Sequence, residues 1–443
     1  MRHQRRWLRL SALLMGLAIF AAACGGDDDD SSGDDTSDTT EGESATAAPP
    51  IGEAEPSCTG DSDGTLTIGA LLPETGDLSF LGPPAIAAAK LAVEDVNAAG
   101  GVLDKDVAYL PGDSGDADPD VANPTVDGHL AANADVILGA ESSGVSLNVI
   151  DKIVGACKIQ FSPANTSPQF TDYDDDDLYF RTAPSDVLQG QVLSELMLED
   201  NVATAALLAR QDAYGEGLLQ YTKEPFEEGG GEVVVDRTYD PEAQTFEAEV
   251  DEIISEDPDA LVMIGFEESG RILTSLFEQG FTPDKKNIYL VDGNIGNALG
   301  EDFTDPGTLV GIKGTLPSAE VTEDFTARLK EVDPALTDLS YGPETYDAVV
   351  ITALATLQAE TDDPAKVAAV INGITRDGEE CTTFEQCAGL IADGTDIDYN
   401  GPSGPQDFSQ PGEPTAASFA VLTYGEDNQI DDAATTYREA QLG

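Results

Sequence analysis

Two serines and a glycine, Ser142-Ser143-Gly144, stand where a predicted strand gives way to a predicted helix. The apolar run 136–139 precedes them, and apolar residues at helical spacing follow over 145–156. Unpaired N–H groups at the start of a helix attract an anion, and a serine hydroxyl adds a donor. The pattern indicates either an anion-binding site that includes Ser143 or an ordinary helix cap, since serine also favours the capping position.

Two more polar segments follow predicted strands. Ser162-Pro163-Ala164-Asn165-Thr166 comes after the apolar run 159–162, and Asp292 comes after 288–291. The carboxyl ends of parallel strands meet at one edge of a sheet, where ligands of open α/β sheets bind. The alternatives are a plain turn rich in Pro, Asn and Ser, and an acid that is simply solvated.

The sequence contains few residues that could act in catalysis. The only two histidines are His3 and His129, so histidine-based acid–base or metal chemistry has almost no candidates. The phosphate-binding pattern Gly-x-x-x-x-Gly-Lys-Ser/Thr and the zinc-protease pattern His-Glu-x-x-His are both missing. We expect no enzyme activity, no metal and no cofactor.

The charge balance excludes some partners. The chain has 21 basic and 85 acidic residues, a formal net charge of −64. So acidic a surface argues against binding to nucleic acid or to anionic membrane surfaces.

The N-terminus predicts export. A basic start is followed by an apolar run, Leu10 to Ala23, of the length of a signal sequence. The run ends in Ala21-Ala22-Ala23-Cys24, which fits a lipoprotein signal (1–23) with lipid on Cys24. An ordinary signal peptide with a chance cysteine is the alternative, and the general and twin-arginine export routes both stay open. Residues 24–64 read as an acidic flexible tether, too poor in apolar residues to fold.

Four further cysteines are an even number, as expected of disulfides in an exported chain. Cys381 and Cys387 lie six residues apart and could close a short loop, which leaves Cys58 to pair with Cys157. A zinc half-site at Cys381 and Cys387 is the rival interpretation, although no cysteine or histidine cluster completes it.

The elements that must position these residues alternate between strand and helix. This spacing predicts βαβ units and parallel sheets, and the alternation restarts after 181–184. The roughly 380 residues after the tether suffice for two α/β domains. Strands are predicted at 66–72, 107–110, 136–139, 159–162, 203–209, 233–239, 260–266, 288–291 and 311–316, helices at 84–97, 117–132, 145–156, 188–199, 214–228, 246–256, 269–279, 320–332 and 342–360, and a β-like tail at 408–424.

From about Leu66 to Tyr424, this body resembles the leucine/isoleucine/valine-binding proteins of ABC transporters, which have the type I periplasmic binding fold. The resemblance rests on several phrases in the same order. They are Pro73-Glu74-Thr75-Gly76, Leu81-Gly82, 91–101, 139–145, 162–168, 180–186 with Gln189-Gly190, and 213–217.

The resemblance implies two doubly wound parallel-sheet lobes joined by three crossover segments, near Pro184, Leu316 and Gly401-Pro402. The N-terminal lobe would comprise 65–183 and 317–399, and the C-terminal lobe 184–316 and 400–443. The ligand would lie between the lobes.

The resemblance also implies a ligand set for a zwitterion, whose two charges each need partners once desolvated. Ser143 would bind the carboxylate, and Ala164 (through its backbone) and Thr166 the polar head. Asp292 would bind the ammonium from the other lobe, where the family commonly has Glu. Tyr214 matches a tyrosine that closes over the ligand. Phe266 either lines the pocket or packs locally.

Two departures limit the ligand assignment. Leu81 stands where branched-chain binders often have an aromatic residue, and Pro343 replaces a further aromatic wall position.

Together, the N-terminus and the resemblance lead us to expect a monomeric, lipid-anchored binding protein on the outer face of the cytoplasmic membrane. It would deliver a small amino-acid-like ligand to ABC permease subunits. The alternatives are a ligand-sensing module for a cell-surface receptor, or a binder of a non-amino-acid carboxylate, an amide or urea.

Overall fold

The computed structural model describes residues 54–115 and 119–442. The predicted signal (1–23) and Cys24 lie outside these residues, as does most of the predicted tether. Within the described part, no helix combines the length and the apolar character needed to cross a bilayer.

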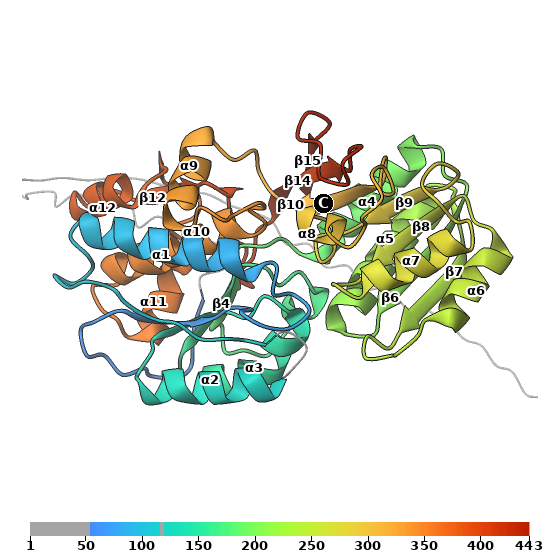
Figure 1. Ribbon diagram of the computed structural model, residues 1–443. Coiled ribbons are helices and arrows are strands. Elements are labelled where there is room, and N and C mark those ends of the chain that lie inside the picture. The colour runs from blue at the N-terminus through green and yellow to red at the C-terminus, as the bar shows by residue number, and fades with distance from the viewer. Residues whose placement is uncertain (1–53, 116–118, 443) are drawn as a thin grey trace, which may run out of the picture. The chain divides into compact units, whose positions relative to one another are not determined.

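Five parallel strands, of which Figure 1 labels β4, form the first sheet in the order β2-β1-β3-β4-β5. The order reverses between β1 and β3, which is the switch point where open α/β sheets bind ligands. The strands are β1 (Thr67–Leu71), β2 (Ala108–Leu110), β3 (Val136–Gly139), β4 (Ile159–Ser162) and β5 (Tyr179–Arg181).

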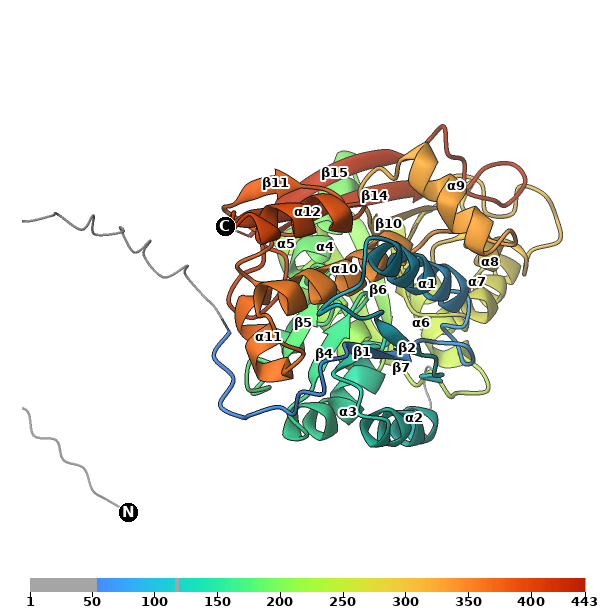
Figure 2. The same ribbon diagram turned by 90° about the vertical axis from the view of Figure 1, so that its left-hand side faces the viewer.

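Helices cover both faces of this sheet (Figure 2). Successive residues of a strand face opposite sides. Val136 and Leu138 therefore pack into one core, and Ile137 packs into the other. The first core is completed by α1 (Gly82–Ala98), α9 (Glu323–Val332), α10 (Gly342–Gln358), α11 (Pro364–Ile371) and α12 (Phe384–Ala392), and the second by α2 (Pro119–Ala131) and α3 (Ser143–Gly155).

The second sheet repeats the same strand order and adds two antiparallel strands at one edge. Its order is β15-β14-β10-β9-β8-β6-β7, in which the strands β6 to β10 are parallel. The strands are β6 (Thr204–Arg210), β7 (Glu232–Tyr239), β8 (Ala260–Ile264), β9 (Asn287–Leu290), β10 (Lys313–Pro317), β14 (Ala416–Thr423) and β15 (Thr436–Gln441). The accompanying helices are α4 (Asp186–Glu199), α5 (Ala213–Glu228), α6 (Glu247–Glu256), α7 (Ser269–Glu278) and the short α8 (Asn297–Gly300). The prediction of two α/β lobes with parallel sheets is confirmed.

Both predicted disulfides are present, Cys58–Cys157 and Cys381–Cys387, so the zinc half-site is wrong. Cys381 ends β11 and Cys387 lies on α12, so the bridge joins a strand to a helix. The strand belongs to a small sheet of β11 (Glu379–Cys381), β12 (Ile397–Gly401) and β13 (Gly404–Pro405). Neither α11, α12 nor this sheet was predicted.

The end of the predicted tether belongs to the folded body. Ser57 donates its backbone N–H to Asp176 (2.9 Å), and Asp63 donates to Asp362 (3.0 Å). The Cys58–Cys157 disulfide ties the segment to the first lobe. The expectation of a flexible tether up to residue 64 is therefore wrong for 54–64, because carboxylates, a disulfide and the burial of Ala54 in the first core hold this segment.

The third crossover also lies later than expected. Gly401 and Gly404 pair across a hairpin between β12 and β13, and Phe408 is buried in the core of the first lobe. The chain enters the second sheet at Ala416, where β14 begins. The Gly401-Pro402 turn, which we interpreted as a crossover, is thus a hairpin turn.

Candidate ligand-binding site

Strand ends from both lobes line one small cavity. It offers about 10 Å³ to the centre of a water molecule, which is room for about one water in this structure. Five of the six predicted ligand-binding residues line it, namely Ser143, Ala164, Tyr214, Phe266 and Asp292. Leu78, Leu81, Glu141, Gly293 and Tyr341 complete the lining.

Ser143 enters the cavity from the first turn of α3. Ser142 is the capping residue, and its hydroxyl accepts from the N–H of Val145 (3.5 Å). The alternative that Ser143 itself caps the helix is therefore wrong. Ser143 is buried, and its hydroxyl accepts from the N–H of Ser167 (3.4 Å). A helix N-terminus and a serine hydroxyl thus meet at the cavity, as an anionic group requires.

The loop after β4 is shaped by Ser162. Its hydroxyl donates to Ala140 O (2.7 Å) and accepts from the N–H groups of Ala164 (3.2 Å) and Asn165 (2.9 Å). This brings Ala164 to the cavity. Thr166 does not line the cavity: it is buried beside Asp186, whose N–H donates to Thr166 O (2.8 Å).

Asp292 follows β9 and is buried. Tyr214 Oη (2.8 Å) and Gln189 Nε2 (2.8 Å) donate to its Oδ1, and Tyr341 Oη (2.7 Å) donates to its Oδ2. Burial raises the pKa of this carboxyl, and the three hydrogen bonds oppose the rise. The group that we predicted to meet an ammonium is thus already held by neutral donors.

A second buried carboxyl, Asp186, lies close enough to Asp292 to sense its charge. Burial, and then the charge of Asp292, raise the pKa of Asp186 well above its usual value. Thr166 faces Asp186 and opposes this rise of the pKa. Neither carboxyl oxygen of Asp186 has a well-formed hydrogen bond among the described residues. Asp186 was not among the predicted site residues, although it ends one of the phrases that carried the resemblance. Its burial at the first turn of α4 is not visible in the sequence.

Two aromatic rings form one wall. Tyr214 stacks on Phe266, with 5.4 Å between ring centroids, and the Arg210 guanidinium lies 3.4 Å from the Phe266 centroid. Tyr341 was missed as well. It precedes α10, has a φ of 57°, and supplies an aromatic ring to the cavity next to the position where Pro343 suggested that one was lost.

Phe266 also lines a larger cavity of about 280 Å³. Phe80, Ile295 and Leu299 give that cavity an apolar wall, and Glu267 and Asp302 also line it. Phe266 thus lies between the two cavities.

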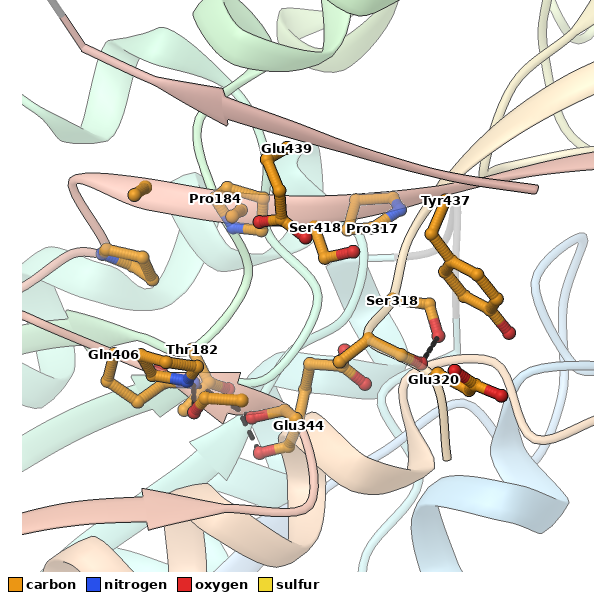
Figure 3. Close-up of a pocket in the computed structure, with 17 residues that line it drawn as sticks. Thr182, Pro184, Pro317, Ser318, Glu320, Glu344, Gln406, Ser418, Tyr437 and Glu439 are labelled. Carbon is orange, nitrogen blue, oxygen red and sulfur yellow. Dashed lines mark hydrogen bonds between the residues drawn. The ribbon is translucent and has the colours of Figure 1, made fainter. Parts of the chain in front are cut away.

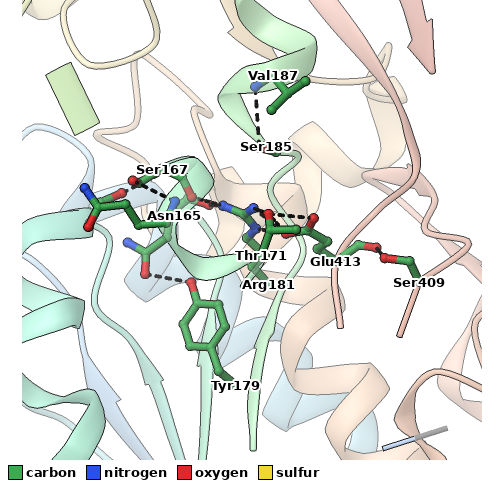
Figure 4. A network of polar contacts seen from close by, with 11 residues as sticks. Asn165, Ser167, Thr171, Tyr179, Arg181, Ser185, Val187, Ser409 and Glu413 are labelled. Carbon is green, nitrogen blue, oxygen red and sulfur yellow. Dashed lines mark hydrogen bonds and ion pairs between the residues drawn. The ribbon is translucent and has the colours of Figure 1, made fainter. Parts of the chain in front are cut away.

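A buried ion pair supports the loop that carries Ala164 (Figure 4). Arg181, at the end of β5, donates to Asn165 O (3.2 Å) and Ser167 O (2.8 Å). The same guanidinium pairs with Glu413, which lies in the segment that leads to β14. The Ala164 loop is thereby fixed to the third crossover.

A model of the periplasmic binding protein family matches residues 65–426. The chain belongs to this family. It is 26% identical over 391 residues to the chemotactic signal transduction system substrate-binding protein BasB of Halobacterium salinarum, covering 84% of this chain and 89% of the relative. It is 28% identical over 212 residues to the Leu/Ile/Val-binding protein BraC3 of Rhizobium johnstonii, covering 47% and 56%.

Solved structures show the same fold. The leucine-binding protein LivK of Thermotoga maritima superposes with a TM-score of 0.70 at 20% identity, over 85% of this chain and 99% of that one. A solute-binding protein of R. palustris in complex with benzoate gives 0.68 at 18%, over 86% and 98%. The protein is therefore a type I periplasmic solute-binding protein. Its relatives are binding proteins and not enzymes, and the family implies export.

Proposed function

We propose that this protein captures a small amino-acid-like ligand between its lobes and delivers it to an ABC importer. The observation that carries the proposal is Asp292: a buried carboxyl of the second lobe that lines the same cavity as Ser143 and the N-terminus of α3 from the first lobe. An α-amino acid carries one charge for each of these groups.

The ligand's ammonium group would bind between Asp292 and Asp186, in place of the Tyr341 hydroxyl. A cation between the two carboxyls would lower the raised pKa of Asp186, so that Asp186 and Asp292 would both bind the cation in their ionised form. The carboxylate would bind Ser143 and the Ala164 backbone, which line the cavity, whereas Thr166 would lie behind them beside Asp186.

The ligand's side chain would extend past Phe266 into the larger cavity. Phe80, Ile295 and Leu299 favour a mainly apolar side chain there. With room for about one water beside Asp292 in this structure, the lobes must separate to admit the ligand and close to complete its contacts.

A thermal-shift screen over amino acids, amides, carboxylates and urea identifies the ligand, and calorimetry then tests the site. Asp292→Asn should weaken the binding of an amino acid by about two orders of magnitude, because it removes one of the two carboxyls that hold the buried ammonium. Ser143→Ala should weaken both an amino acid and a simple carboxylate. The matched controls are Asp338→Asn and Ser194→Ala, since neither residue lines this cavity. Unchanged affinity in both cavity variants would place the site elsewhere.

A sensory role is the second candidate. The named function of BasB, chemotactic signal transduction, favours it, because that relative is matched along most of both chains. Deletion of the gene separates the two roles: loss of ligand uptake supports transport, whereas loss of taxis with normal uptake supports sensing.

We also propose that lipid on Cys24 attaches the protein to the membrane. Mass spectrometry of the native N-terminus tests this. An acylated Cys24 supports it, and an unmodified N-terminus at Gly25 or later would exclude it.

A further inference from the structure

A third cavity, of about 290 Å³, lies where the three crossovers meet (Figure 3). Thr182 and Pro184 line it from the first crossover, Pro317 and Glu320 from the second, and Gln406 and Pro414 from the third. Because every connection between the lobes contributes, any movement of one lobe against the other must change this cavity.

The chemistry of the lining is acidic and apolar. Glu344, in the first turn of α10, is buried, and Figure 3 shows its side chain extending into the cavity. Among the described residues its carboxyl has no partner beyond its own backbone N–H. Glu320 and Glu439 are exposed at the edge, and no described Lys, Arg or His lines the cavity. A buried carboxyl without a partner points to an occupant that brings a cation.

The other residues that line the cavity indicate which kind of cation would fit. Four prolines and three alanines provide an apolar wall, and Tyr437, which is 43% exposed, presents a ring at the edge. No described group of three or more His, Cys, Asp or Glu side chains is arranged to hold a metal ion. An ammonium on a short alkyl chain matches both the carboxyl and the wall, with the ring adding a cation–π contact.

We propose that this crossover cavity binds a small alkylammonium ion through Glu344 and thereby favours the closed arrangement of the lobes. The cavity is formed here while the ligand cavity has room for only about one water. An occupant that fits this arrangement better than an open one shifts the population towards closure.

Binding of the alkylammonium ion should release the proton from the Glu344 carboxyl. Burial raises the pKa of Glu344 to about 8, and the charge of Asp347 on the same helix adds to the rise. Glu320 on the second crossover and Glu439 and Tyr437 on β15 are the other titratable groups that face the cavity. With Glu344 largely protonated at pH 6.5, the cation should bind about 25-fold more weakly there than at pH 8.5.

The test uses n-butylammonium chloride and the full mature protein, with 1-butanol and sodium chloride as controls. Calorimetry should show binding to wild type, no binding to Glu344→Gln, and no binding of 1-butanol to either protein. The pH dependence should disappear in Glu344→Gln. Tyr437→Ala, a change at an exposed position, should weaken binding about threefold.

X-ray scattering of the free protein then tests the coupling. Butylammonium should reduce the radius of gyration of wild type and leave that of Glu344→Gln unchanged. No binding to wild type, or equal binding to Glu344→Gln, would overturn the site. Binding without compaction would overturn the link to closure. None of these measurements requires the ligand of the principal site, so this proposal and the proposed function fail independently.

Discussion

The hydroxyl of Tyr341 donates a 2.7 Å hydrogen bond to Asp292 Oδ2, and this bond joins the helix α10 of the first lobe to the end of β9 in the second. Both residues are buried, and both line the ligand cavity. In this structure a tyrosine therefore occupies the position at Asp292 that the proposed ammonium group would take.

Tyr341→Phe should open the free protein. A hydrogen bond to a charged group contributes about 1.5–3 kcal/mol, so its loss should lower the ratio of closed to open molecules by roughly 10- to 100-fold. X-ray scattering without ligand measures this as a larger radius of gyration. Tyr289→Phe is the matched control, since Tyr289 also donates to a carboxylate, Asp200 (2.7 Å), but within the second lobe. Equal scattering from both variants would contradict the bridging role.

Arg181→Met should destabilise the protein by about 3–5 kcal/mol, because it leaves Glu413 buried without its partner. Urea unfolding measures the loss. Ligand affinity should fall too, because the carbonyls of Asn165 and Ser167 lose their donor beside Ala164. The control is Arg438→Met. Its partner Glu199 is largely exposed, so this change should cost less than about 1 kcal/mol.

The two disulfides should contribute unequally. Cys58–Cys157 spans 99 residues and Cys381–Cys387 spans 6, so loop closure predicts about 4–5 and about 2 kcal/mol respectively. Replacing each pair by serine and comparing urea midpoints tests this order. A larger loss from the short loop would mean that loop length does not govern the stabilisation here.

Asp186→Asn should flatten the dependence of stability on pH. The folded protein keeps a proton on Asp186 that the unfolded chain releases above about pH 4, because burial and Asp292 raise its pKa. The unfolded state then binds fewer protons, and the free energy of unfolding of the ligand-free wild type falls as pH rises. Asp186→Asn should lose less stability between pH 5 and 8, as measured by urea unfolding at each pH. Parallel curves for the two proteins would show that Asp186 is ionised in the fold.

Much of the architecture could be predicted from the residues alone, since strand and helix periods, helix ends and turns are local signals. The alternation along the chain indicated two parallel sheets, and residues placed directly after strands, such as Ser143 and Asp292, had to reach a common edge. The disulfides followed from an even cysteine count and one short spacing. The Gly401-Pro402 turn was misread, because a turn residue shows that the chain bends but not which element it next pairs with.

The contacts of Asp292 depend on the tertiary structure. Tyr341 lies 49 positions further along the chain and Tyr214 lies 78 positions before it, and nothing local in either segment marks a hydrogen bond to this carboxyl. Asp186 and Glu344 were two acids among 85 until folding buried them. Desolvation arises only when distant elements close around a group, so a pattern of neighbouring residues shows where a carboxyl stands in an element but not whether water reaches it.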